Sequence, residues 1–227
     1  MANHIARPLE GWHKMKVLRF LGTVVLAMSC GSLFAAPAGH TERANCQLDV
    51  DPTKACRFSI DEAKYEIGRQ GRILKSATGA SDRATQLPFD GWVLDTLLYM
   101  PYEHDLILIC EVEDGESEGG LIFRLDHDLA IKWRLKFPAF NLSVGALEDR
   151  YLYQAGIGTV AKVDLERGVY AWKHENLYDP KLRSYNSFRK PEVSSDQVVF
   201  QEELTPQTRG PARSIRVDKL SGSMQQE

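Results

Sequence analysis

Short runs of alternating hydrophobic and polar residues, separated by turn-forming residues, make up most of the chain. In the clearest stretch, strand-prone runs cover 150–154, 159–163 and 169–172. Glycine- and aspartate-rich segments at 156–158 and 164–168 separate these runs and have the composition of tight turns. The pattern predicts an antiparallel meander, and its extent predicts an all-β fold.

The meander recurs along the chain. Each copy starts a strand directly after an aspartate: Asp105, Asp149 and Asp196. These positions are 44 residues (105 to 149) and 47 residues (149 to 196) apart. The next strand in each copy ends in a second aspartate: Asp126, Asp164 and Asp218. Trp133 and Trp172 follow the first two of these aspartates, whereas the third copy has no tryptophan, as expected for a terminal repeat with no neighbour on its outer side.

The Asp…Gly…Trp spacing resembles one blade of a quinoprotein-type β-propeller. This resemblance implies a partial, about three-bladed, β-propeller-like meander of four-stranded antiparallel sheets, with blades at about 91–136, 137–175 and 188–227. Closed propellers contain four to eight blades. We therefore expect an open ring whose exposed edges are covered by the N-terminal segment, or a homo-oligomer. The quinoprotein dehydrogenases need a much larger closed ring, so we predict no cofactor.

Residues 1–38 have the pattern of a cleaved secretory signal. Basic residues precede an apolar run at 20–35, and small residues follow it. Met15 is an alternative start. The apolar run is shorter than the roughly 20 residues that a membrane span needs, so we expect export to the periplasm without stable membrane insertion. Residues 39–90 are expected to hold a disulfide, a degenerate hairpin (64–74) and a polar linker (76–86).

Three cysteines remain beyond residue 38. In an oxidising compartment, Cys46 and Cys56 are expected to form a disulfide across the turn-prone segment 49–54. Cys110 lies within the apolar run 106–112 and is expected to be an inert core residue.

Charge and motifs exclude several function classes. The full chain has 28 basic and 31 acidic residues. Without residues 1–38, 24 basic and 30 acidic residues remain, which gives a net charge of −6. The sequence has no basic stripe, and this together with the negative net charge disfavours nucleic-acid binding. No nucleophile motif or cysteine–histidine cluster with metal-ligand spacing is present. The acidic segment 111–118 is expected to be a solvated hairpin loop, with calcium binding as the alternative. We predict a protein without catalytic, cofactor or metal residues.

An exported repeat protein without catalytic residues is expected to bind another protein. In a four-stranded meander, the loops between second and third strands share a rim with the connections between blades. That rim collects 113–119, 137–143, 156–158, 175–188 and 204–211. Aromatic, Arg and Asn/Ser residues in two of these loops have the composition of interface anchors. The candidate partner-binding residues are Phe140, Asn141, Leu142, Ser143, Tyr178, Arg183 and Tyr185. The alternative is that Phe137, Phe140 and Phe188 pack between blades.

Signal peptide, short N-terminal disulfide and about three repeats together resemble the periplasmic immunity proteins that neutralise type VI secretion peptidoglycan amidases. The resemblance implies that a loop enters the cleft of a cysteine-type amidase and blocks its nucleophile and histidine. Ser143, flanked by Asn141 and Leu142, is the candidate tip of that loop. The alternative is an envelope scaffold or assembly factor, resembling the propeller lipoprotein of the outer-membrane barrel machinery.

Overall fold

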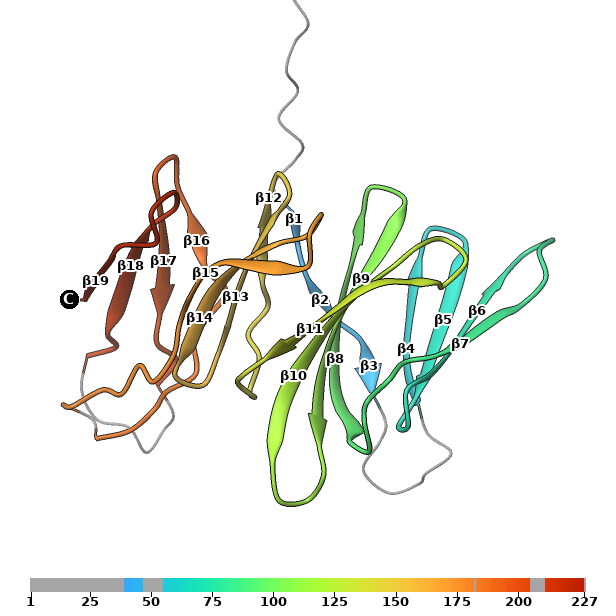
Figure 1. The fold of residues 1–227 in the computed structure, drawn as a ribbon, viewed down its shortest axis with the longest axis horizontal. Helices are drawn as coiled ribbons and strands as arrows, with labels where there is room; N and C mark the ends of the chain where they lie inside the picture. Colours follow the sequence, from blue (N-terminus) through green and yellow to red (C-terminus); the bar gives the residue numbers. More distant parts are fainter. Residues whose placement is uncertain (1–38, 47–54, 182, 205–210, 227) are drawn as a thin grey trace, which may run out of the picture. The chain divides into compact units, whose positions relative to one another are not determined.

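The computed structural model describes residues 39–46, 55–181, 183–204 and 211–226, in which every regular element is a β-strand. These strands form four antiparallel sheets, numbered here in chain order (Figure 1). All described residues belong to one unit, Ala35–Glu227. The all-β, propeller-like fold class is confirmed. The predicted signal peptide lies outside the described residues.

Each sheet is a meander of strands adjacent in sequence, and three of the four gain one more strand from the N-terminal segment. The first sheet contains β3 (Asn45–Cys46), β4 (Ala55–Ile60), β5 (Ala63–Gly68), β6 (Arg72–Ala77) and β7 (Arg83–Gln86). The second contains β2 (Glu42–Arg43), β8 (Val93–Tyr102), β9 (Asp105–Glu113), β10 (Glu118–Leu125) and β11 (Ile131–Phe137). The third contains β1 (Gly39–His40), β12 (Ala146–Glu148), β13 (Tyr151–Gly156), β14 (Thr159–Asp164) and β15 (Val169–His174). The fourth contains β16 (Glu192–Val193), β17 (Gln197–Gln201), β18 (Ser214–Asp218) and β19 (Met224–Gln226).

The predicted number of blades was one too low. Residues 64–74 form most of β5 and the first half of β6 inside a complete sheet, not a degenerate hairpin. The predicted linker 76–86 ends in β7, which pairs along β6 from Arg72↔Gln86 to Lys75↔Arg83. The three predicted blades correspond to the second, third and fourth sheets.

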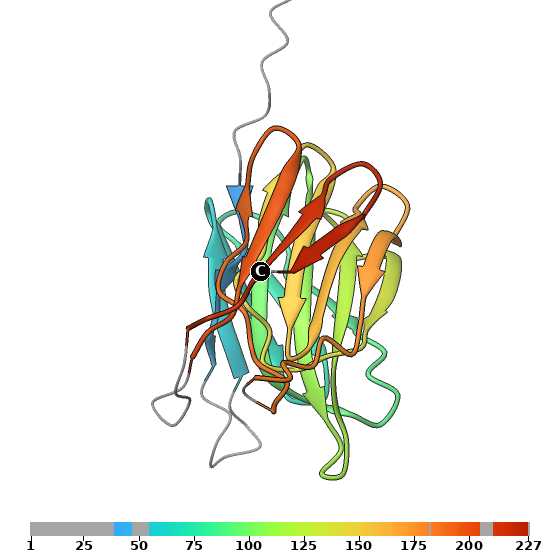
Figure 2. The same ribbon diagram turned by 90° about the vertical axis from the view of Figure 1, so that its left-hand side faces the viewer.

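Neighbouring sheets pack face to face through three separate hydrophobic clusters, which join the first to the second, the second to the third, and the third to the fourth sheet. Representative members, in that order, are Ile67 with Phe123, Ile109 with Leu152, and Tyr153 with Phe200. The fourth sheet, with β16 to β19, faces the viewer in Figure 2. Because the middle sheets are covered on both faces, β9, β10, β13 and β14 are buried along nearly their whole length, whereas β4 and β17 alternate between buried and more exposed positions.

Residues 39–46, which we call the N-terminal strap, cross three sheets in succession. β1 pairs with β12, β2 with β8, and β3 with β4. Buried Thr41 exchanges two hydrogen bonds with Gly145: its backbone N–H donates to the Gly145 carbonyl (3.1 Å), and its hydroxyl accepts from the Gly145 N–H (2.7 Å). The Tyr99 hydroxyl donates to the Glu42 carboxylate (2.8 Å), and burial together with this contact raises the pKa of Tyr99 to about 12. The N-terminal segment therefore adds an edge strand to three of the four sheets, whereas the fourth sheet receives none of its described strands.

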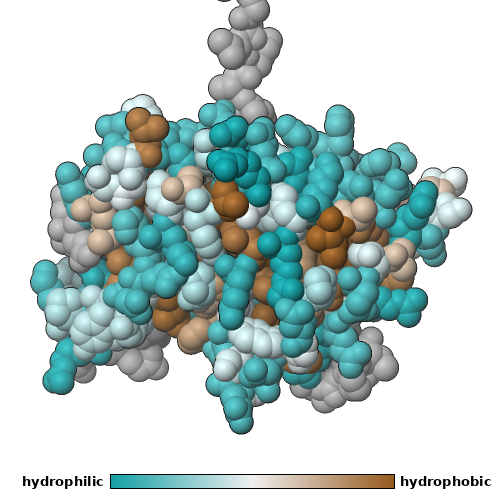
Figure 3. Space-filling model, viewed as in Figure 1, coloured by the Kyte–Doolittle hydropathy of each residue, from teal (hydrophilic) through white to brown (hydrophobic). Residues whose placement is uncertain are grey.

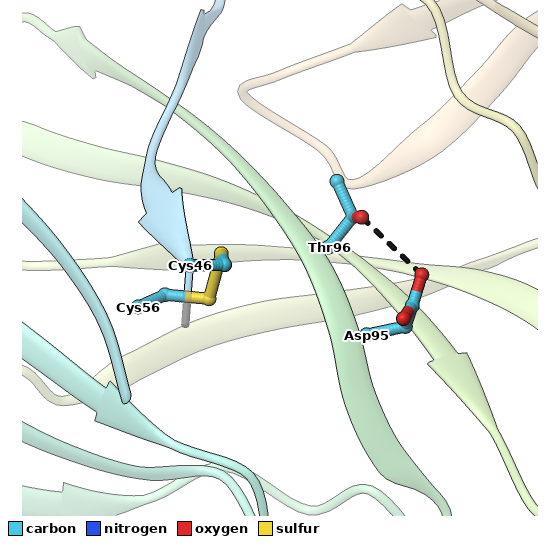
Figure 4. Close-up of a disulfide and its surroundings, with 4 residues drawn as sticks. All are labelled: Cys46, Cys56, Asp95 and Thr96. Atoms are coloured by element: carbon cyan, nitrogen blue, oxygen red, sulfur yellow. Dashed lines mark hydrogen bonds between the residues drawn. A yellow bond between two sulfur atoms is a disulfide. The ribbon is translucent and has the colours of Figure 1, made fainter. Parts of the chain in front are cut away.

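The strap ends in the predicted disulfide. Cys46 and Cys56 face each other in the β3–β4 register and are bonded (Figure 4). Cys110 is buried inside the second sheet, and burial raises the pKa of its thiol far above the ordinary value, so it is an inert core residue as predicted.

Removing the disulfide is expected to destabilise the protein without unfolding it. The bridge spans 10 residues, and closing a loop of this size stabilises a fold by about 2 to 3 kcal/mol. The double variant Cys46→Ala/Cys56→Ala should lose this amount in urea unfolding. Dithiothreitol should lower the stability of the wild type to the same level and leave the variant unchanged; equal stability of the two oxidised proteins would contradict the assignment.

Two tryptophans join consecutive sheets. The ring of Trp133, on β11, covers Gly168 in the turn between β14 and β15, and its indole N–H donates to the Leu165 carbonyl (2.9 Å). The ring of Trp172, on β15, covers Gly222 in the equivalent turn of the fourth sheet in the same way. In the first of these turns the Asp164 carboxylate accepts from two backbone N–H groups. The repeated Asp…Gly and Trp therefore form a joint in which one sheet supplies the tryptophan and the next supplies the turn.

Candidate protein-binding rim

The predicted rim segments come together at one end of the sheets, around a groove of about 760 Å³. Its walls come from the second sheet, the strap and the connections between sheets. Members of the predicted rim segments that line it are Asn141, Leu142, Ser143, Ile157, Tyr185, Asn186, Ser187, Phe188 and Leu204. The fifth predicted segment, 113–119, lines a smaller recess together with Phe140. We refer to this groove and its borders as the rim.

The connection between β11 and β12 is packed into the protein. Leu142 is 2% exposed and belongs to the cluster between the second and third sheets. Ser143 is 8% exposed, and its backbone N–H and hydroxyl both donate to the Ala155 carbonyl. A plug that enters the cleft of an enzyme needs an exposed tip. The predicted role of Ser143 and Leu142 as such a tip is therefore wrong, because the inter-sheet core holds both residues; they form part of the groove wall.

The aromatic residues of this connection and the next divide between core and surface. Phe137 and Phe188 are fully buried, as the packing alternative expected, whereas Phe140 is half-buried beside the 113–118 loop. Asn141 is exposed and adopts a left-handed backbone conformation, with a φ of 50°.

The acidic segment 111–118 has structural partners. The buried carboxylate of Glu111 accepts a hydrogen bond from the Asn141 N–H. Burial raises the pKa of Glu111, partly offset by this hydrogen bond. Glu113 pairs with Arg69, and the Asp114 carboxylate accepts from the backbone of Glu116 and Ser117. Within the described part of the chain, no three His, Cys, Asp or Glu side chains group in a way that could hold a metal ion.

Tyr178 and Tyr185 form an exposed aromatic pair on the connection between β15 and β16. They are 43% and 49% exposed, and their rings meet edge to face with centroids 5.3 Å apart. The segment between them folds back on itself through an antiparallel bridge from Asp179 to Ser184. The Tyr185 ring lies over Gly158, where a Cβ atom would come within 2.7 Å of it. The pair is therefore held on the third sheet and is not free in solvent.

A buried ion pair of the fourth sheet fixes this connection from the other side. The Arg213 guanidinium donates to the Glu202 carboxylate (2.6 Å), and the two side chains are 9% and 0% exposed. The same guanidinium donates to the carbonyls of Leu177 (2.8 Å) and Tyr178 (3.1 Å). The backbone that carries the tyrosine pair is thus fixed by donors that sequence reasoning did not identify.

The groove has a mainly acidic wall and a mainly basic wall, and each also carries one charge of the opposite sign, Arg43 and Glu203 respectively. Asp95 and Glu111 line it from β8 and β9, and Figure 4 shows Asp95 accepting a hydrogen bond from the Thr96 hydroxyl. Arg189 and Lys190 line it from the connection that carries the tyrosine pair. Asp95 occupies a β-bulge between Leu94 and Thr96, which places its side chain out of the regular register of β8.

The three predicted residues on the second connection are all at the surface. Tyr178, Arg183 and Tyr185 are exposed, and Arg183 lies between the tyrosines with a φ of 54°. On the face drawn in Figure 3, hydrophilic residues dominate and hydrophobic residues appear in small patches. Among the described residues, no helix is long and apolar enough to cross a membrane.

Comparison with known proteins adds a fold-level similarity. No protein-family model and no curated protein matches the sequence. One similar solved structure is that of BamB from Moraxella catarrhalis, with a TM-score of 0.46 and 17% sequence identity. The match covers 72% of this chain and 48% of BamB, so the chain spans about half the length of that protein.

Proposed function

We propose that this chain is an exported protein-binding module of the bacterial periplasm, and that it uses the rim to inhibit a peptidoglycan amidase. The observation that carries the proposal is the exposed Tyr178–Tyr185 pair, fixed from two sides beside a groove. Tyrosines that are held rigidly and only half-exposed lose little conformational entropy on binding, and tyrosine is enriched among the residues that dominate binding energy.

The disulfide and the predicted signal support the periplasmic location. Cys46 and Cys56 are bonded in the structure, and such bonds persist in oxidising compartments such as the periplasm. Signal cleavage after residue 38 would leave β1, which begins at Gly39, at the start of the mature chain.

The amidase as target follows from the resemblance to periplasmic immunity proteins, and the structure changes the mechanism that we propose. Because Leu142 and Ser143 are packed in the protein, they cannot enter a cleft. The exposed residues Tyr178, Lys181, Arg183 and Tyr185, at and around the Asp179–Ser184 bridge, would instead cover the mouth of the amidase cleft and exclude substrate from the nucleophilic cysteine and its histidine. The groove would receive the border of the cleft.

Removing both tyrosine rings is expected to weaken inhibition strongly. The variant Tyr178→Ala/Tyr185→Ala should raise the inhibition constant for the cognate cysteine-type amidase by roughly thirtyfold, since truncating an anchor residue costs about 2 kcal/mol of binding energy. The measurement is hydrolysis of purified peptidoglycan by the amidase with increasing amounts of inhibitor.

Leu220 provides the control for this experiment. It is 94% exposed and follows Asp218, which pairs with Gln197 at the end of the fourth sheet opposite the rim. Leu220→Ala should inhibit as well as the wild type. Full inhibition by the tyrosine variant would exclude the rim as the binding face, and tight binding of the wild type without any inhibition would support a scaffold rather than an inhibitor.

A further inference from the structure

Four exposed cations surround the tyrosine pair: Lys181, Arg183, Arg189 and Lys190. We call them the basic cluster. Lys181 and Arg183 lie within the segment closed by the Asp179–Ser184 bridge, between the two tyrosines. Arg189 and Lys190 line the groove beside Tyr185. Two of the four cations thus lie beside the Asp179–Ser184 bridge, and the other two lie on the groove wall.

The cluster is unusual for this protein because four exposed cations without an ion pair among the described residues fall within ten residues of the chain. None of its members forms an ion pair with a described residue, whereas cations in other parts of the surface, such as Arg57, Arg134 and Arg150, pair with carboxylates. The mature domain has a predicted net charge of −6. Four cations without ion pairs to described residues in a short segment are therefore a local excess of positive charge on a protein that is negative as a whole. Such local charge steers association toward a surface of opposite sign.

The distribution of charge along the groove also restricts the orientation in which a partner can bind. Asp95 and Glu111, on β8 and β9 of the second sheet, form its acidic wall, where Arg43 of the strap supplies one cation. Glu203, which follows β17, is the carboxylate on the basic side. A uniformly acidic ligand that filled the groove would be repelled by the acidic wall. An acidic surface that contacts only the basic cluster would avoid this repulsion.

We infer that the partner presents an acidic surface, which contacts the basic cluster around the tyrosine pair and leaves the Asp95–Glu111 wall to neutral or basic groups. This inference rests on the proposed function, because it specifies the chemistry of the protein that the rim binds. The tyrosines supply the apolar contact, and the four cations supply the long-range attraction and the orientation.

The test uses the full mature chain and a defined probe, a short fluorescein-labelled peptide of alternating Glu and Ser residues, with a Lys–Ser peptide as its counterpart. Fluorescence anisotropy should show binding of the acidic peptide alone. The variant Arg183→Glu/Lys190→Glu should bind it roughly tenfold more weakly, because it replaces two attractive surface charges by two that repel the peptide. Asp95→Asn should bind it about twofold more tightly, because it removes repulsion at the edge of the site.

A matched control separates the cluster from net charge. Lys64 and Arg72 are exposed on the outer face of the first sheet, where they form no ion pair with a described residue. Lys64→Glu/Arg72→Glu changes the net charge by the same amount and should leave binding unchanged. Equal weakening by both double variants would overturn the inference, as would the absence of peptide binding or preferential binding to phosphatidylglycerol vesicles.

The two proposals fail in different ways. If the charge variants keep wild-type amidase inhibition while the tyrosine variant loses it, the rim is the binding face and the inferred partner chemistry is wrong. If the tyrosine variant also keeps inhibition, the proposed function itself is wrong.

Discussion

Replacing Trp133 with alanine is expected to lower the free energy of unfolding by about 3 kcal/mol, since large-to-small replacement of a packed tryptophan costs about 3 to 5 kcal/mol and this ring is partly exposed. The ring covers Gly168 and packs against the cluster between the second and third sheets, and its N–H satisfies the Leu165 carbonyl. Because this joint links two sheets of one domain, we expect the lower free energy of unfolding to be measured in equilibrium urea unfolding of the whole domain. An unchanged midpoint would show that this joint does not stabilise the fold.

Two further variants separate the contributions to this joint. Trp133→Phe keeps most of the ring and loses the hydrogen bond, so it should cost about 1 kcal/mol. Gly168→Ala places a Cβ within 2.6 Å of the Trp133 ring at a φ of 65°, so it should be destabilising in the wild type. In the Trp133→Ala background the steric part disappears and only the backbone part remains. A double-mutant cycle should therefore show coupling between the two positions, and additive effects would contradict the packing.

The presence or absence of this joint explains why three of the four sheets could be predicted from the sequence and the first could not. Asp164 with Gly168 and Asp218 with Gly222 are conspicuous because each turn must receive a tryptophan from the preceding sheet. The first sheet has no preceding sheet, and β6 ends at Ala77 with no aspartate there; Asp82 lies at the other end of the turn, directly before β7. Contact with the second sheet uses other groups. Lys75 donates to the His127 carbonyl (2.6 Å), and Arg83 pairs with Asp128. A search for the repeated pattern therefore missed a sheet that is structurally equivalent.

The strap was predictable only as a covering segment. Each of its strands contains two residues, and two of its three pairings reach across more than 50 positions, as from Glu42 to Tyr99. A period-two pattern cannot be recognised in two residues, so nothing in the local sequence specifies which sheet each part joins. The disulfide was predictable because the redox compartment and the short loop both favour the same pair of cysteines.

At the rim, composition identified the right segments and assigned one of them the wrong role. Tyr178 and Tyr185 are exposed, as interface composition suggested, because the bridge and Gly158 support them at the surface. Leu142 and Ser143 lie in an equally polar-looking connection, yet that connection crosses the junction of two sheets and packs into it. Whether a loop projects or packs depends on long-range contacts, which local composition does not contain.

The two outer sheets lack the residues of the Trp joint on their outer sides. The fourth sheet has no tryptophan on β19 to offer, and the first has no aspartate turn to receive one. The outer face of the first sheet carries Arg57 paired with Glu66. A second copy stacked on the outer face of the first sheet would bury this ion pair without forming the Trp joint, and removing two charges from water costs free energy.

Replacing Arg213 with methionine is expected to produce the largest change in the protein, a loss of about 4 kcal/mol of stability, together with loss of binding at the rim. Breaking a buried ion pair on one side costs about 3 to 5 kcal/mol because the remaining charge is left uncompensated. Glu202 is fully buried and would be that charge. The carbonyls of Leu177 and Tyr178 would lose their donors at the same time. Chemical denaturation and the amidase inhibition assay measure the two effects.

The double variant Glu202→Leu/Arg213→Met separates stability from binding. Replacing both partners of a buried pair by apolar residues of similar volume is often close to neutral, so most of the lost stability should return. Inhibition should stay weak, because no guanidinium remains to fix the backbone beneath Tyr178. Recovery of both properties would mean that the tyrosine pair is positioned by the Asp179–Ser184 bridge and Gly158 alone. Recovery of stability without inhibition would establish Arg213 as the residue that couples the folding of the fourth sheet to the geometry of the binding face.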